Sequence, residues 1–328
     1  MRRLSPWFMI CSVIMLLVSS GSVRAVPKAT LDLSGYADDA GVISILHQGE
    51  TVDPYFALQA LLLAHENGLD MAPAAEKWAD WLVERQKPDA TFDRFCRTGP
   101  VWAPCKTADA DDALLALWMK FLDTMPVQLK NKTVWKKSYQ ASATALRRLR
   151  DNRGIYLVSP VYQHGLFMDN LEVWSYRPTR QAGADSKGVG KFGESIHAVF
   201  WDEKAQRFLV STQPEQKHVA PAFYPDDVAQ LFPLFVDFPL LPIDSKTYYQ
   251  RWMRLHRAQW LKQPATDFAW GLIAVLALRQ GDAPSARCWL RETARFRHTV
   301  HWTVTDEVAN QILVSKGLRP AAANVPCQ

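Results

Sequence analysis

Helical periodicity covers most of this chain and limits its fold more than any other feature of the sequence. Apolar residues recur at spacings of three and four over stretches of ordinary helix length, and Gly, Pro, Asn or Asp separates each stretch from the next. The pattern predicts twelve helices, at about residues 36–47, 53–67, 72–87, 109–124, 134–149, 167–176, 188–200, 225–237, 244–261, 266–280, 282–297 and 303–316.

Twelve helices with short links are expected to pair as six antiparallel hairpins. Six hairpins can close into a double ring, in which alternate helices lie inside and outside. Residues 56–63 and 113–118 are apolar nearly all round, as inner helices should be, whereas residues 136–150 and 251–262 are rich in Lys and Arg. The sequence therefore predicts an all-α toroid of about six hairpins.

Short β-structure is expected at two places in this helical chain. Residues 155–158 can form a strand. Residues 200–211 can form a β-hairpin, because residues 202–205 supply a polar turn between two apolar stretches.

Acidic residues gather where the even-numbered predicted helices begin. In a closed double ring the inner helices share a direction, so these acids would meet around one mouth. Asp and Glu also cap the free N–H groups of any helix start, and single acids are explained well by capping. Several carboxylates in apolar, buried helices favour a polar site, because an unpartnered buried carboxylate is costly. The acids concerned are Glu50, Asp53, Asp109, Asp111, Asp112, Asp169, Glu172, Asp226, Asp227, Asp267, Asp306 and Glu307, with Asn170 beside them.

Aromatic residues lie within a few positions of these acids. Sugar rings stack on aromatic side chains and leave their hydroxyls to carboxylates, whereas core packing is the alternative for about half of such aromatics. Trp102 is the strongest candidate for a sugar platform, because its loop carries Gly99, Pro100 and Pro104. The others are Tyr55, Trp174, Tyr224, Trp270 and Trp302.

The first 25 residues have the order of a secretory signal. Arg2 and Arg3 precede an apolar run at residues 7–18, and Val23-Arg24-Ala25 fits the small-x-small cleavage pattern. The alternative, an uncleaved membrane anchor, needs about 20 apolar residues. We expect residues 1–25 to be removed and residues 26–328 to form a single domain, in the periplasm or secreted, without stable membrane insertion.

The charge of the chain argues against nucleic acid as a partner. The net charge of +5 falls to about +2 once residues 1–25 are removed, because they hold three arginines and no acid. No basic stripe with interleaved aromatics is present. The sequence also lacks a GxSxG, a Walker loop and a dinucleotide fingerprint in its strand–helix context.

The cysteines predict disulfides and no metal. Cys96 and Cys105 lie close together in a Gly/Pro-bearing loop, so a disulfide between them is expected in an oxidising compartment. Cys11 leaves with the signal, and Cys288 and Cys327 are left to pair. Zinc is the competing explanation, but no CxxC or HExxH spacing supports it. We therefore expect no metal and no cofactor.

The predicted helices and several short motifs resemble those of a known family. Twelve helices, with Phe200-Trp201-Asp202 before a strand-like turn, resemble the (α/α)6 toroid of the six-hairpin glycosidases. The motifs are most similar to those of the family 8 glycoside hydrolases, which include bacterial cellulases secreted beside cellulose synthase. In that family an acid precedes a Tyr-led inner helix, an Asp-rich segment opens a later one, and a Tyr-x-x-Asp-x-x-Arg-like segment followed by Pro carries the base. The matching segments here are Glu50 to Tyr55, residues 109–116 and residues 224–233.

The resemblance implies an inverting glycoside hydrolase that uses two carboxylates. Its substrate would be a bacterial exopolysaccharide, with a cellulose-like β-glucan as one candidate. Glu50 or Asp53 would donate the proton, and Asp227, with Asp226 as second choice, would be the base. The residues expected to bind the polysaccharide or oligosaccharide are Tyr55, Trp102, Asp109, Asp112, Asp169, Asn170, Glu172, Tyr224 and Trp270.

One departure from the family pattern motivates a second hypothesis. Gln230 stands where the family segment has Arg. A non-catalytic polysaccharide-binding or export accessory protein on the same fold is therefore the alternative, with exopolysaccharide synthesis or export proteins as candidate partners. For either function, the double ring predicts that one cleft is lined by Asp53, Asp109, Asp169 and Asp227, together with Tyr55 and Tyr224.

Overall fold

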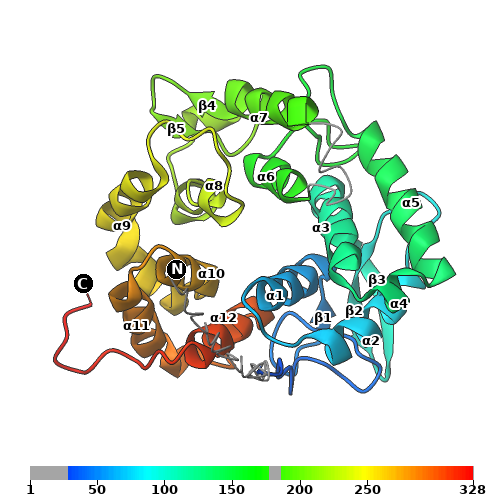
Figure 1. The fold of residues 1–328 in the computed structure, drawn as a ribbon, viewed down its shortest axis with the longest axis horizontal. Coiled ribbons are helices and arrows are strands. Elements are labelled where there is room, and N and C mark those ends of the chain that lie inside the picture. The colour runs from blue at the N-terminus through cyan, green and yellow to red at the C-terminus, as the bar shows by residue number, and fades with distance from the viewer. Residues whose placement is uncertain (1–28, 177–185, 328) are drawn as a thin grey trace, which may run out of the picture.

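Two concentric layers of helices form a closed ring in the computed structural model, which describes residues 29–176 and 186–327 (Figure 1). The predicted all-α toroid is confirmed. The inner layer of the described chain consists of α1 (Pro54–Glu66), α3 (Asp111–Thr124), α6 (Phe167–Ser175), α8 (Phe232–Phe235), α10 (Gly271–Arg279) and α12 (Val304–Ser315).

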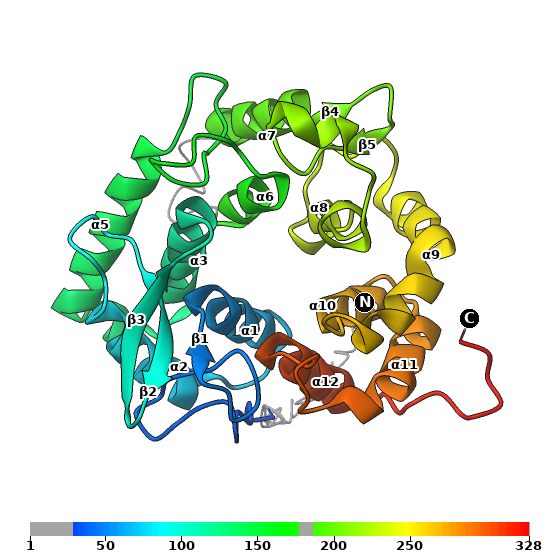
Figure 2. The same ribbon diagram turned by 180° about the vertical axis from the view of Figure 1, so that it is seen from behind.

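The outer layer covers the inner one around the circumference (Figures 1 and 2). Short elements link the two layers: α4 (Val127–Lys130) and single turns at Pro214–His218, Gln263–Ala265 and Ala294–Phe296. The outer helices are α2 (Ala72–Val83), α5 (Thr133–Arg148), α7 (Ser186–Phe200), α9 (Ser245–Lys262) and α11 (Ala283–Glu292).

The amount of apolar surface on each helix decides its layer. Buried residues run without a break from Asp112 to Met119 in α3, since other helices surround it. In α5 the buried residues Trp135, Ser138, Ser142 and Leu146 follow one stripe at spacings of three and four. A single stripe needs cover on one side only, so α5 lies outside with its basic residues in solvent.

The predicted helix at residues 36–47 is wrong. Gly35 and Gly41 turn the chain at φ values of 81° and 85°, and the Asp38 carboxylate accepts the Val42 N–H that a helix would need. The segment instead seals the ring between α12 and α1. The Val304 N–H donates to the Ile45 carbonyl at 2.8 Å.

The predicted helix at residues 225–237 is present only in part: residues 225–229 and 232–235 are helical, and a turn at residues 230–231 interrupts them. A single wide turn covers Phe223–Asp227, and α8 begins only at Phe232. Pro233 lacks the N–H that a continuous helix requires at this interior position. The Asp226 and Asp227 carboxylates therefore do not stand at the start of a regular inner helix.

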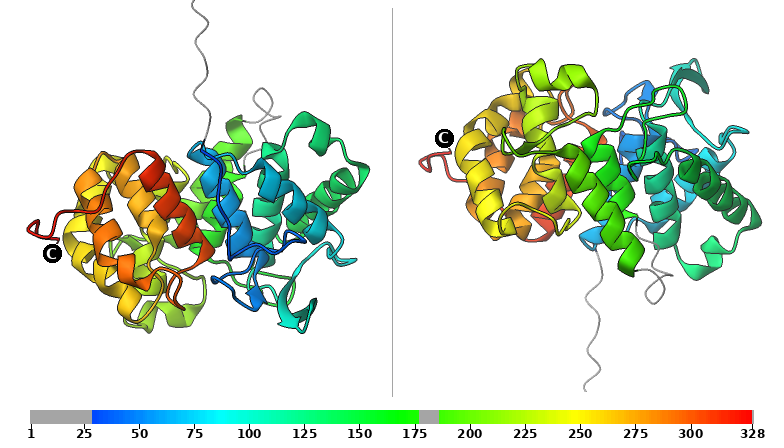
Figure 3. Two further views of the ribbon diagram at one scale, coloured as in Figure 1. Left: turned by 90° about the horizontal axis from the view of Figure 1, so that it is seen from below. Right: turned by 90° about the horizontal axis from the view of Figure 1, so that it is seen from above.

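A three-stranded antiparallel sheet stands beside α1 at one end of the ring axis (Figure 3). It contains β1 (Thr51–Val52), β2 (Asp93–Thr98) and β3 (Val101–Thr107). The sequence predicted a disulfide-bridged loop here but not the strands. The bridge itself, Cys96–Cys105, is present.

The remaining local predictions have mixed outcomes. The hairpin within residues 200–211 is confirmed by β4 (Trp201–Asp202) and β5 (Arg207–Phe208). No strand forms at 155–158 in the described chain, where Tyr156 makes only an isolated bridge to Arg150. The second predicted disulfide, Cys288–Cys327, pins the C-terminal segment to α11.

The predicted signal at residues 1–25 lies outside the described residues. Within the described ranges, no helix combines the length and the apolar character that crossing a membrane would require.

We predict that Gly271→Ala destabilises the ring. A Cβ at Gly271 would lie 2.7 Å from the Ala309 Cβ and 2.9 Å from the Trp289 ring, so α10 would have to shift away from both neighbours. Overpacking of this kind lowers the free energy of unfolding by about 1–3 kcal/mol, which chemical denaturation would measure. Gly190→Ala is the control, because no atom lies within 4 Å of its added Cβ. Equal stability of the Gly271 variant and the wild type would contradict this packing.

Candidate active site

A cavity of about 370 Å³ lies on the ring axis, where the inner helices begin. Its wall includes the first turn of α1, the residues before α3, the start of α6 and the segments that lead into α10 and α12. The N-terminal ends of the inner helices therefore meet at one face, as the double ring predicted. The cavity carries the acids Asp53, Asp109, Asp169, Asp267 and Asp306 and the aromatics Tyr55, Phe56, Tyr224, Phe268 and Trp270.

Arg94 of β2 joins two of these acids. Its Nε donates to Asp53 Oδ2 at 2.7 Å, and its Nη2 donates to Asp109 Oδ2. Asp53 is buried and also caps α1, because its Oδ1 accepts the Tyr55 N–H at 3.0 Å. Burial raises the pKa of Asp53, and the Arg94 charge opposes that shift. Asp109 is different, since 78% of its side chain is exposed.

Asp169 and Asp112 form a buried carboxyl pair beneath the cavity. Asp112 is fully buried in the first turn of α3, and Asp169 lies in the first turn of α6. The charge of Asp169 acts on the Asp112 carboxyl, so the two do not favour ionisation together. Burial, followed by the charge of Asp109, raises the pKa of Asp169 to about 7. Burial and the charge of Asp169 raise the pKa of Asp112 well above its usual range.

Glu172 extends this acid cluster towards the middle of the ring. Its Oε1 accepts the Tyr55 hydroxyl at 2.6 Å, and that hydroxyl oxygen accepts the Gln59 amide at 3.1 Å. Oε2 has no hydrogen-bond donor among the described residues. Burial first, and the charge of Asp169 second, raise the pKa of Glu172 well above its usual value. Three neighbouring acids thus favour their neutral forms, which is a feature of functional sites.

Aromatic side chains form the wall of the cavity on the side of α10. The Tyr224 and Trp270 rings lie 5.0 Å apart between centroids, and Phe56 meets Phe268 edge-to-face at 5.9 Å. Trp270 adopts a left-handed backbone with φ of 52°, and its carbonyl accepts the Trp260 indole N–H at 3.3 Å. Such a conformation costs a non-glycine residue about 1–3 kcal/mol and is found preferentially at functional sites.

Asp306 serves the framework of the cavity. It forms a capping box with Thr303 at the start of α12 and accepts the Gly271 N–H at 2.7 Å. Burial raises its pKa to about 6, against the effect of these hydrogen bonds. Every oxygen of this carboxylate has a partner that ties α10 to α12 or caps α12.

The predicted base residues lie outside the cavity. Asp227 faces the outer layer, where its Oδ2 lies 3.2 Å from His256 Nδ1 of α9. Asp226 is buried, and Arg207, Gln216 and the Ala222 N–H donate to it. The predicted cleft lined by Asp227 is therefore wrong for that residue, because the broken helix at 223–235 turns both acids away from the axis.

Five other predicted residues also lie away from the cavity lining, among them the buried Asp112 and Glu172, which instead lines the second cavity. Glu50 is exposed, just before β1. Trp102 donates its indole N–H to Asp38 at 2.9 Å on the hairpin instead of offering a ring to the cavity. Asn170 is buried and exchanges hydrogen bonds with the Tyr156 backbone, which fixes the segment before α6.

Arg94, Asp267 and Phe268 line the cavity but were not predicted as site residues. Asp267 and Phe268 lie just before α10, and the acid was noted only as part of a helix start. Arg94 had no signal at all, because only the unpredicted strand β2 brings it to the cavity.

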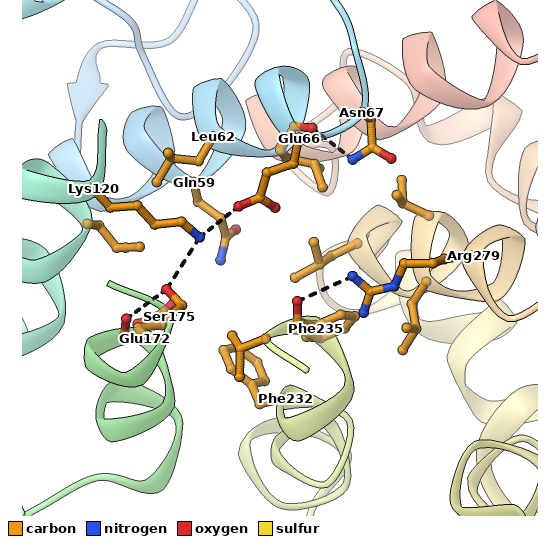
Figure 4. A pocket seen from close by; sticks show the side chains of 16 residues that line it. Gln59, Leu62, Glu66, Asn67, Lys120, Glu172, Ser175, Phe232, Phe235 and Arg279 are labelled. Carbon is orange, nitrogen blue, oxygen red and sulfur yellow. Dashed lines mark hydrogen bonds and ion pairs between the residues drawn. The ribbon is translucent and has the colours of Figure 1, made fainter. Parts of the chain in front are cut away.

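A second cavity, of about 150 Å³, lies at the opposite end of the ring (Figure 4). Lys120 bridges Glu66 at 2.7 Å and Ser175 at 3.4 Å, and Arg279 donates to backbone carbonyls at the end of α8. Gln59, Phe232 and Leu272 line both cavities and so form the waist between them. No group of three or more His, Cys, Asp or Glu side chains in the described ranges could hold a metal ion.

Comparison with known proteins supports the fold. No family model matches the chain, and no curated protein matches it. Three chains of solved structures match, and one of them is described as "a novel alpha-amylase from Clostridium perfringens". That match has 10% identity and a TM-score of 0.59, and it covers 86% of this chain and 94% of the other. The likeness shows the shared helical-toroid fold alone, and family 8 membership stays a prediction.

We predict that Asp169→Asn stabilises the protein at neutral and alkaline pH. A folded-state pKa of about 7 exceeds the unfolded value of about 3.9, so the wild type loses stability as the pH rises from 4 to 7. An amide imitates the neutral acid and does not titrate. The melting temperature of the variant should therefore exceed that of the wild type at pH 8, and the difference should shrink at pH 4. A variant that is less stable than the wild type at pH 8 would show that the buried pair does not strain the fold.

Proposed function

We propose that this protein is a glycoside hydrolase that cleaves a bacterial exopolysaccharide. The observation that carries the proposal is the cavity on the ring axis, which Asp169 and Asp109 both line. The pKa of Asp169 is about 7, and the charge of the exposed Asp109 is one cause of that raised pKa. Glycoside hydrolysis needs one neutral acid and one ionised carboxylate at the same bond. The aromatic wall supplies the surface on which a sugar ring can stack.

Asp169 is the proton donor in this proposal, and Asp109 is the base. Asp169 gives its proton to the glycosidic oxygen as the bond to the anomeric carbon breaks. Asp109 takes a proton from the water that attacks that carbon from the opposite face, which gives inversion. Asp53 is a weaker candidate for either role, because the α1 cap and Arg94 engage both of its oxygens. Tyr224 and Trp270 hold the sugar.

A binding protein without catalysis is the second candidate. Arg94 donates to both Asp53 and Asp109, and so occupies a carboxylate oxygen of each that a base would need for the attacking water. The same cavity could then hold an oligosaccharide for export proteins without cleaving it.

Export from the cytoplasm is part of the proposal. The signal pattern of residues 1–25 and the two disulfides support a periplasmic or secreted protein, because disulfides persist in oxidising compartments.

We predict that Asp169→Asn abolishes hydrolysis while Asp227→Asn retains it. Loss of a general acid lowers kcat by about 10²–10⁴-fold, whereas Asp227 pairs with His256 outside the cavity. Wild-type activity should fall above about pH 7, since the donor must be neutral. Reducing-sugar release from a panel of bacterial glucans and other polysaccharides would measure both variants. A loss of activity in Asp227→Asn with the fold retained would indicate that Asp227, as predicted from the sequence, is the base.

The two candidate functions differ in the products. If the protein only binds, calorimetry should detect an oligosaccharide and no new reducing ends should form. In either case Trp270→Ala should weaken binding by about tenfold, as expected for loss of a stacking contact of 1–1.5 kcal/mol. Trp102→Ala is the matched control, because its indole packs on the hairpin. Equal weakening by the two variants would place the sugar elsewhere.

A further inference from the structure

The inner helices surround the cavity on the axis. Each inner helix or the segment before it contributes to the wall, including Tyr55 of α1, Leu114 of α3 and Thr305 of α12. The floor is the waist of Gln59, Phe232 and Leu272, and beyond it the Lys120–Glu66 pair occupies the opposite end of the ring (Figure 4). A polysaccharide chain therefore cannot pass along the axis.

The hairpin of β2 and β3 connects the starts of α1 and α3 through Arg94. Arg94 reaches from β2 to Asp53 at the start of α1 and to Asp109 before α3, and all three residues line the cavity. The hairpin stands at this end of the ring axis (Figure 3). Arg94 thus lies across the path that a groove leaving the cavity beside α1 would take.

The hairpin is braced as a rigid wall. The Cys96–Cys105 disulfide links its two strands. On its outer side, Asp38 accepts the Trp102 indole N–H at 2.9 Å and pairs with Arg97 at 3.7 Å. These contacts hold β2, the strand that carries Arg94, so the position of Arg94 does not depend on a mobile loop.

We propose that this site is a pocket for the end of a sugar chain, and that Arg94 is the residue that excludes the chain interior. The inference rests on the proposed carbohydrate function and narrows it to terminal units or short oligosaccharides. A cavity of about 370 Å³ is near the lower end for ligand pockets, which run from about 300 to 1,000 Å³. An extended groove would have to leave the ring, and Arg94 with Asp53 and Asp109 stands in that path.

Binding as a function of chain length tests the proposal without requiring catalysis. The probes are β-1,4-linked and α-1,4-linked glucose oligomers from disaccharide to hexasaccharide, titrated into the wild-type protein by calorimetry. For the series that binds, Kd should stop falling at the trisaccharide, with less than about a twofold change beyond it, or about 0.4 kcal/mol. In Arg94→Ala the Kd should continue to fall by about tenfold from trisaccharide to hexasaccharide. Lys106→Ala removes a cation from the facing strand of the same hairpin and should behave as the wild type.

Asp109→Asn provides a second variant if loss of Arg94 from the buried Asp53 prevents folding. It removes the charge that pairs with Arg94 on the exposed side, so the Kd should again continue to fall as the oligomer lengthens. Wild-type affinity that keeps rising to the hexasaccharide would overturn the proposal, as would variants that keep the wild-type plateau. If none of these oligomers binds, the inference fails together with the proposed substrate class.

Product analysis separates this inference from the proposed hydrolysis. Cleavage at chain ends should release one short product while the viscosity of a polymer substrate falls slowly. A rapid fall in viscosity would support the hydrolase activity and contradict the proposal of a pocket for chain ends. Binding limited to short oligomers with no cleavage of any polymer would retain the pocket and reject the hydrolase.

Discussion

The common direction of the inner helices is the constraint on which the rest of the structure depends. Each inner helix is too apolar to face solvent, so each is enclosed by its neighbours, and the alternation of layers gives all of them the same sense (Figure 1). Their unpaired N–H groups and positive dipole ends then meet at one face. That face attracts acids whatever the function, and the cavity on the axis is where their charges come together.

Burying charged carboxylates at this face lowers the stability of the fold, and the structure reduces that loss in two ways. Arg94 compensates the charges of Asp53 and Asp109. No cation within hydrogen-bonding distance reaches Asp112 or Asp169 among the described residues, so burial favours their neutral forms instead. One cluster thus contains ionised carboxylates beside neutral ones. Such a division between neighbouring carboxyls is the arrangement that acid–base chemistry requires.

The sequence predicted the ring and most of its mouth, because both follow from local patterns. Helical period placed α1, α3, α6 and α12, and the position of acids at their starts led to Asp53, Asp109 and Asp169. Pro233 interrupts the helix that was expected to aim Asp227 inward. Arg94 could not be predicted, because its role depends on the pairing of β2 with β1, which is distant in sequence.

Helix capping explains the positions of some of these acids but not of others. Asp53 and Asp306 accept N–H groups at the starts of their own helices, so capping explains their positions even though both line the cavity. Asp169 and Glu172 lie one helical turn apart on α6, where neither provides the cap of that helix. Each leaves an oxygen without a donor among the described residues. Burial without such a partner lowers stability. The strongest reason to retain Asp169 is therefore its place in the cavity, and Glu172 holds the hydroxyl of Tyr55, which lines that cavity. Asp53 and Asp306 would be favoured in any protein of this fold.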